Sequence, residues 1–156
     1  MSPGVVAFVI CGVAAGLEGA LAGRGVRARF VELRLPPYSP SLPAWFLIGG
    51  AYYVICFVVL YRLLRSGPLS GSRAVAFILL LMLMALNAAW GVLFFRLKNL
   101  RASFLAFVPY GVLTLLLVGM LAITDRMSAL LLAAYLVYLG YALWWSYRVW
   151  VLNAHR

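Results

Sequence analysis

Asn87 and Trp90 lie near the end of a long apolar segment, in the stretch NAAWGVLFF that ends at Phe95. Their spacing puts the amide and the indole on the same face of a helix, and Phe94 continues that face. An amide that faces lipid without a partner costs several kcal/mol, so Asn87 is expected to point inward. There it either hydrogen-bonds a neighbouring helix or lines a polar spot in an apolar cavity beside Trp90, and the spacing leaves both open.

The last apolar segment carries a second set of residues that suits a pocket. Tyr135, Tyr138 and Ala142 recur at helical spacing and share one face. Tyrosine hydroxyls deep in lipid need hydrogen-bond partners, which a bundle interior or a pocket supplies. We assign the aromatic residues from Trp144 to Trp150 to the belt at the membrane interface, where such side chains are enriched.

The elements that position these residues are predicted to be membrane helices. The chain has 156 residues, of which 67% are hydrophobic and 10% charged. Its five apolar stretches, at about 5–21, 45–64, 74–95, 103–123 and 128–152, each approach the roughly 20 residues that cross a bilayer. They are continuously apolar, unlike the alternating strands of a barrel. We predict an all-α integral membrane bundle of five transmembrane helices that forms one domain over residues 1–156, with the first stretch retained as a helix.

The positive charge is distributed as expected for membrane topology. One side of the predicted bundle carries nine basic residues: Arg24, Arg27, Arg29, Arg34, Arg96, Lys98, Arg101, Arg148 and Arg156. The other side carries four, namely Arg62, Arg65, Arg73 and Arg126. The positive-inside rule then places the C-terminus in the cytoplasm and accounts for the charge without nucleic acid. A bacterial cytoplasmic membrane is expected, with the mitochondrial outer membrane as the alternative.

The first connecting segment, about residues 22–44, is the longest and is predicted to be a lid or a connector. It holds four arginines and then LPPYSPSLPAW, whose prolines favour extended backbone. Tyr38 and Trp45 lie in this stretch and would be near the lid. A further proline, Pro109, lies inside the fourth helix and is expected to kink it.

The first helix offers two features that the sequence alone leaves undecided. Gly12 and Gly16 form a small-residue face, which we expect to pack inside the monomer, with a dimer contact as the alternative. Glu18 lies toward the end of this helix. We expect its carboxylate to pair with an arginine of the next segment, or else to face a pocket.

Several short motifs occur in a fixed order along the five segments. They are Pro36-x-x-x-Pro40, Tyr52-Tyr53, Asn87-x-x-Trp90 with Phe94-Phe95, Asp125, Tyr135-Leu136-x-Tyr138, Ala142 and Leu152-Asn153. In this order and spacing they resemble the TspO/MBR family, the tryptophan-rich sensory proteins and the translocator protein, over about residues 5–153.

The resemblance implies a five-helix bundle with a ligand pocket under the first loop. The pocket would be lined by Tyr53, Asn87, Trp90, Phe94, Tyr135, Tyr138 and Ala142, with Tyr38 and Trp45 near the lid. Arg29 and Arg34 are candidates for meeting ligand carboxylates. The implied ligand is a flat hydrophobic molecule, either a tetrapyrrole such as protoporphyrin IX or a haem-like molecule, or a sterol. No cofactor is obligatory, and a homodimer is possible.

The sequence departs from the family at two pocket positions. The family tryptophan of the second helix falls at Gly49, and that of the fifth falls at Tyr138. Two aromatic walls are therefore absent or reduced. With one histidine, three acidic residues and no metal-ligand cluster, the chain is not expected to be an enzyme. The function favoured is a membrane sensor or carrier; a structural or assembly subunit and light-dependent porphyrin degradation are the alternatives.

Overall fold

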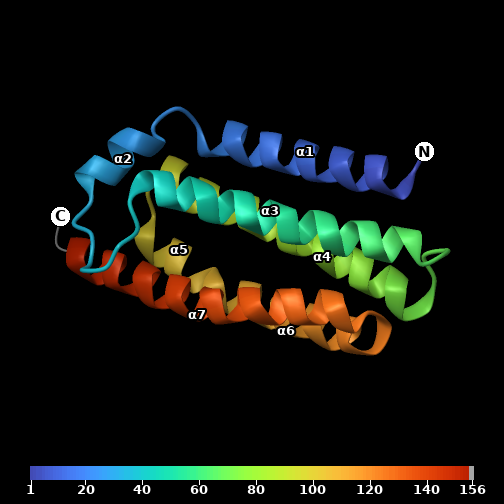
Figure 1. Ribbon diagram of the computed structural model, residues 1–156. Coiled ribbons are helices and arrows are strands. Elements are labelled where there is room, and N and C mark those ends of the chain that lie inside the picture. Colours follow the sequence, from blue (N-terminus) through green and yellow to red (C-terminus); the bar gives the residue numbers. More distant parts are fainter. Residues whose placement is uncertain (155–156) are drawn as a thin grey trace.

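The computed structural model describes residues 1–154 and is built entirely of helices over that range (Figure 1). The elements are α1 (Pro3–Ala22), α2 (Val26–Glu32), α3 (Leu42–Arg65), α4 (Gly71–Gly91), a π-helical turn η1 (Val92–Arg96), α5 (Leu100–Leu105), α6 (Phe107–Thr124) and α7 (Arg126–Asn153). His155 and Arg156 lie outside the described residues, and of the two only Arg156 was included in the charge count.

Five stretches are long and apolar enough to cross a membrane, as predicted. They are Pro3–Ala22, Leu42–Arg65, Gly71–Arg96, Leu100–Thr124 and Arg126–Asn153. Each extends the predicted range by a few residues, because polar caps and proline continue a helix beyond its apolar part. At the start of α1, Ser2 Oγ accepts a hydrogen bond from the Val5 amide at 3.4 Å. At the start of α5, Asn99 Oδ1 accepts one from the Ala102 amide at 2.9 Å.

The fourth span is interrupted at Ala106, between α5 and α6. Pro109 causes the interruption, since its ring displaces the carbonyl four residues earlier, which belongs to Leu105, the last residue of α5. The predicted kink is therefore confirmed, one turn before the proline.

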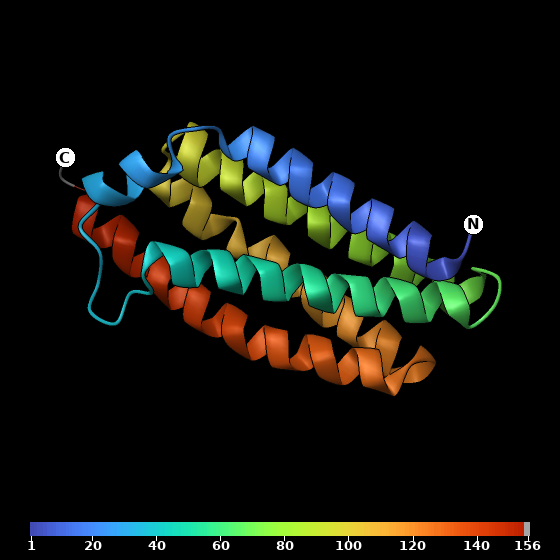
Figure 2. The ribbon, with the colours of Figure 1, turned by 45° about the horizontal axis from the view of Figure 1, so that its top comes forward.

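The five spans form a closed ring around a common interior. In order around the ring, α1 packs on α3, α3 on α7, α7 on α6, α6 on α4, and α4 on α1. Figure 2 shows α1 and α3 drawing apart toward the end of the bundle that carries α2. The two groups of basic residues lie at opposite ends, since consecutive spans run in opposite directions.

The connection between the first two spans contains a helix that the sequence analysis did not predict. Residues Val26–Glu32 form α2, which turns Phe30 and Leu33 toward the bundle and leaves Arg27 and Val31 exposed. The later, proline-rich part is not helical before α3 begins at Leu42, but it contains a turn at Pro37 and Tyr38 instead of being extended throughout. The apolar anchors explain the helix, because a seven-residue helix is stabilised by packing and not by its own propensity.

The small-residue face of α1 does not pack inside the monomer, so that expectation was wrong. Gly12 and Gly16 are exposed, and an added Cβ at either position would meet no atom within 4 Å. The face that packs carries Ala7 and Cys11, both buried, followed one and two turns later by Ala14 and Glu18. The apolar contacts of the neighbouring helices select this face, not the spacing of glycines.

The end of the bundle opposite α2 is closed by polar side chains. Arg62 donates from Nε and Nη2 to the two carboxylate oxygens of Asp125 at 2.6 and 2.7 Å, and Ser128 Oγ donates to Asp125 Oδ2 at 2.6 Å. The Arg62 and Ser128 hydrogen bonds hold the pKa of the Asp125 carboxyl at about 2, below its ordinary value. Arg73 donates to the carbonyls of Leu63, Ser66, Gly67 and Pro68 and so fastens the α3–α4 turn.

Candidate ligand-binding cavity

A cavity of about 560 Å³ lies inside the ring of helices, at the end that carries α2. This volume falls in the range of roughly 300–1,000 Å³ that small-molecule sites occupy. The walls come from every span and from α2. Most of the lining is aromatic or aliphatic, and the polar groups gather at the deeper end.

Eight of the nine predicted site residues line this cavity. They are Trp45, Tyr53, Asn87, Trp90, Phe94, Tyr135, Tyr138 and Ala142. The structure thus brings together side chains from three different spans on one interior space.

Tyr38 is the exception and lies outside the cavity. It occupies a turn in which the Ser39 amide donates to the Pro36 carbonyl, and its φ of 66° is unusual for a residue with a side chain. That conformation directs the ring outward, where it is 91% exposed. Tyr38 contributes only its backbone carbonyl, which accepts a hydrogen bond from Tyr141 Oη at 3.0 Å.

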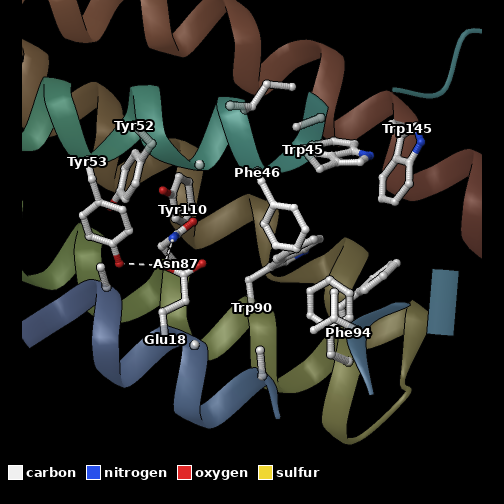
Figure 3. Close-up of a pocket in the computed structure, with 18 of the residues that line it drawn as sticks. Glu18, Trp45, Phe46, Tyr52, Tyr53, Asn87, Trp90, Phe94, Tyr110 and Trp145 are labelled. Atoms are coloured by element: carbon white, nitrogen blue, oxygen red, sulfur yellow. Dashed lines mark hydrogen bonds between the residues drawn. The ribbon is translucent and has the colours of Figure 1, made fainter. Parts of the chain in front are cut away.

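Asn87 is held at the deeper end by Glu18. Glu18 Oε2 accepts one hydrogen bond from Asn87 Nδ2 at 2.8 Å and another from Tyr53 Oη at 2.6 Å (Figure 3). Asn87 therefore has both of the roles considered from the sequence. Its amide joins α4 to α1, and it also borders the cavity. The expectation that Glu18 pairs with an arginine was wrong: it is part-buried in the cavity wall.

A pair of tyrosines lies beside this polar group. The hydroxyls of Tyr110 and Tyr135 are 2.9 Å apart and both rings are buried. This hydrogen bond joins α6 to α7 and gives the Tyr135 hydroxyl the partner that a deep tyrosine was expected to need. Tyr52 packs against Tyr135 with ring centroids 5.2 Å apart.

The end of the cavity that lies nearest α2, which we call the mouth, is lined by aromatic rings. Trp90 stacks on Phe94 with centroids 5.0 Å apart and planes 17° apart, and meets Phe95 edge-on at 6.2 Å. Both phenylalanines lie in the π-helical turn η1, whose wider turn lets neighbouring residues face the cavity together. Trp145 packs against Trp45 at 4.8 Å and against Phe94 at 5.7 Å.

The segment from α2 to Ser41 covers this end of the cavity and is tied to α7. Trp145 Nε1 donates to Ser39 Oγ at 2.8 Å. The Asn153 amide donates to the Arg34 carbonyl at 3.0 Å and accepts from the Arg34 amide at 3.1 Å. Phe30, on α2, stacks toward Trp145 at 6.3 Å and lines the cavity. The arrangement is that of a cover fastened at several points along one helix.

The arginines that were candidates for ligand contact do not reach the cavity. Arg29 lies 3.6 Å from Glu32 and donates to the Lys98 carbonyl at 3.3 Å, so its side chain is directed toward the segment that carries Lys98. Arg34 is exposed and is engaged through its backbone. Neither borders the cavity.

The cavity opens sideways between α1 and α3. Phe46 and Gly49 from α3 and Gly19 from α1 line it and are also exposed, Phe46 to 65%. Gly49 is the position for which the resemblance implied a tryptophan, and a Cβ there would meet no atom within 4 Å. This position therefore borders open space.

Two important lining residues were absent from the predicted site: Trp145, and Glu18, for which a pocket position was only the alternative. Trp145 is only 1% exposed, although it was assigned to the interfacial belt. Its spacing contained the correct signal, because it continues the face of Tyr138 and Ala142 by one turn. Glu18 had no such signal, since one acidic residue near a helix end fits either environment. Within residues 1–154 no three His, Cys, Asp or Glu side chains are grouped to hold a metal ion.

Comparison with known proteins assigns the chain to a family. No curated protein sequence matches it significantly. The family model described as TspO/MBR family matches residues 5–151, nearly the whole chain. The five spans and the ring in which they pack agree with that match, and the chain belongs to the TspO/MBR family, whose members are membrane sensory and ligand-binding proteins.

Proposed function

We propose that this membrane protein binds a flat, mostly apolar small molecule of the tetrapyrrole or sterol class, and acts as its sensor or carrier. The observation that carries the proposal is the aromatic cavity under the α2 cover. Flat ligands are held best between aromatic faces, and a few fixed polar groups orient them. Such faces are supplied within one enclosed region by four side chains, Trp90, Phe94, Trp45 and Trp145.

The cavity also compensates in part for the family tryptophans that this chain lacks. Trp145 supplies an indole to the wall at a position one and two turns from Ala142 and Tyr138. Two indole nitrogens, those of Trp45 and Trp90, are buried without a hydrogen-bond partner in the described part of the chain. Such donors suit ligand acceptor groups, since buried polar groups are normally paired.

The test is a titration of the detergent-solubilised protein with protoporphyrin IX, followed by quenching of tryptophan fluorescence. We expect saturable quenching in wild type and an affinity about tenfold lower in Trp90→Ala, because a central aromatic contact is lost. Trp144→Ala is the matched control: it also removes one tryptophan, but this residue is exposed and does not line the cavity. Equal affinities in all three proteins would contradict the proposal.

We further propose that binding proceeds without catalysis. The alternative, light-dependent degradation of a bound porphyrin, would give products that form in light and are absent from a sample kept dark.

A homodimer or assembly role stays a prediction. The neighbouring helices α1 and α4 expose four small residues, Gly12, Gly16, Ala85 and Ala89. Small residues permit close contact between helices. Measuring the mass of the protein in detergent tests that role.

For the compartment, we propose a bacterial cytoplasmic membrane with the cavity end and the C-terminus on the cytoplasmic side. The proposal rests on the larger number of arginines at that end. Accessibility of a cysteine introduced in the α3–α4 turn, compared with one introduced in α2, would test the orientation.

A further inference from the structure

We propose that the ligand of this cavity carries a protonated amine on its flat apolar body, and that Glu18 is the counter-ion for that amine. The inference rests on the proposed function, the binding of flat and mostly apolar molecules, and adds a positive charge that neither protoporphyrin IX nor a sterol carries. It predicts that such an amine binds this cavity more tightly than a dicarboxylic tetrapyrrole does.

The hydrogen bonds around Glu18 are those of a carboxylate acceptor. Tyr53 Oη and Asn87 Nδ2 both donate to the same oxygen, Oε2, at 2.6 and 2.8 Å. The other oxygen, Oε1, accepts no hydrogen bond from the residues that the structure describes. Donors that converge on a carboxylate stabilise and orient its ionised form. One oxygen is thus fixed by the protein, and the other is left for a ligand.

No basic side chain within the described residues 1–154 balances this charge. Among the cavity's lining residues there is no Lys, Arg or His, and Glu18 takes part in none of the ion pairs within residues 1–154. The arginines nearest in sequence, which begin at Arg24, follow the end of α1. A buried charge without a partner is costly, and ionisable groups inside membrane bundles are commonly found at ligand or ion sites. A cationic ligand would supply the missing partner.

The surroundings of Glu18 suit an ammonium group better than a metal ion. Tyr52, Tyr53 and Tyr110 lie at the same end of the cavity as Glu18 and Asn87, whereas Trp45, Phe94 and Trp145 lie at the other (Figure 3). Aromatic rings attract organic cations through their faces. An amphiphile would therefore place its amine at the deeper, tyrosine-rich end and its flat body between the indoles.

The same carboxylate disfavours a carboxylate ligand at the deeper end. Like charges brought together in a region of low dielectric repel strongly. A dicarboxylic porphyrin would have to keep its acid groups at the mouth, whereas an amine-bearing ligand would enter fully. The structure thus assigns a preference by charge among molecules of the same shape.

Three pyrene probes with the same ring system test this preference: 1-pyrenemethylamine, 1-pyrenemethanol and 1-pyreneacetic acid. Binding to the full chain in an uncharged detergent is followed by energy transfer from tryptophan to pyrene, with empty micelles as the blank. In wild type we expect the amine to bind about tenfold or more tightly than the alcohol, and the acid to bind most weakly.

The variant Glu18→Gln keeps an oxygen that can accept from Tyr53 and Asn87 but removes the charge. We expect it to lose about tenfold in affinity for the amine and to leave the alcohol unchanged. Glu32→Gln is the matched control, because it removes one negative charge from α2, on the outer side of the cover. We expect that variant to bind all three probes as wild type does.

The outcomes distinguish the two proposals. Equal binding of the three probes to wild type, or an amine affinity that Glu18→Gln leaves unchanged, overturns the charge preference and leaves the proposed function standing. Absence of saturable binding for all three probes and for protoporphyrin IX overturns the proposed function and this inference together. The order of affinities in wild type needs no variant, so the test holds even if Glu18→Gln does not fold.

Discussion

The two ends of this bundle are built from the same helices but packed in different ways. At the end away from α2, the interior is filled by aliphatic side chains, among them Leu60, Leu80, Leu117 and Leu132, which are all fully buried. At the α2 end, the interior positions of the same helices carry aromatic or small residues such as Trp90, Gly49 and Ala142. The first set leaves no comparable space, whereas the second surrounds a cavity of about 560 Å³.

The difference shows that residue volume, not helix placement, decides where the cavity lies. Leucine side chains adapt to one another and fill the space between helices at the density of a protein interior. Large rigid rings next to glycine and alanine cannot fill it in the same way. The polar groups follow the same division, because Arg62 and Asp125 close the packed end from outside, whereas Glu18 and Asn87 face the open interior.

The largest expected effect tests this contrast within α7. Leu132→Ala removes a fully buried side chain at the packed end and should lower the free energy of unfolding by about 2–5 kcal/mol. Leu139→Ala makes the same change two turns later on the same helix, where the side chain already borders the cavity. It should cost less, because fewer packing contacts are lost.

Unfolding of both variants by denaturant in the same detergent measures the two free energies. Ligand affinity, measured in parallel, should be unchanged in Leu132→Ala. Equal costs for the two truncations would mean that the cavity end is packed as tightly as the other end, and the comparison would fail.

The second expected effect is a loss of binding without a loss of stability. Gly49→Leu adds a side chain at a residue that lines the cavity, where no atom lies within 4 Å of the new Cβ. The affinity for a flat ligand should fall about tenfold, since the side chain occupies ligand space. The thermal midpoint should stay equal or rise, because leucine favours a helix more than glycine does.

Gly50→Leu is the matched control for this change. Gly50 is the next residue of α3, is exposed, has the same free space around its Cβ and does not line the cavity. Its affinity should equal that of wild type. A similar fall in both variants would indicate a general effect on α3 and not the filling of a site.

The five spans were predictable because each is a continuous apolar stretch of membrane-crossing length. The break before Pro109 followed from the chemistry of proline in the same way. The helix α2 was not predictable from its charged sequence, since it depends on Phe30 and Leu33 packing against residues from η1 and α7. The exposed face of α1 was also missed, because small residues permit close packing but do not require it.

Within the site, residues that share a helix face were predictable and partners across helices were not. Asn87 and Trp90, or Tyr135 and Tyr138, are related by spacing along one helix. The Glu18–Asn87 contact joins residues 69 positions apart, and no local pattern reports such a distance. The prediction that Tyr38 lines the pocket was wrong because of its backbone conformation. Its left-handed φ turns the ring away from the cavity, although the loop that carries Tyr38 covers that cavity.

The smallest expected effect is on thermal stability, comes from the end of the bundle opposite α2, and depends on pH. Because the folded-state pKa of Asp125 is about 2, below its ordinary value of 3.8, its ionised form stabilises the folded protein above pH 4. That contribution is lost as the pH falls from about 4 to 2 and protons bind the carboxylate. Asp125→Asn should therefore lower the thermal midpoint by only a few degrees at pH 7, because Arg62 is partly exposed and solvent weakens its ion pair with Asp125. The difference from wild type should shrink as the pH falls from 4 to 2 and vanish only below the folded-state pKa, while the affinity for a flat ligand stays unchanged at pH 7. Thermal unfolding measured across that pH range checks the first point, and a change in affinity would show that the closed end and the cavity end are coupled instead of independent.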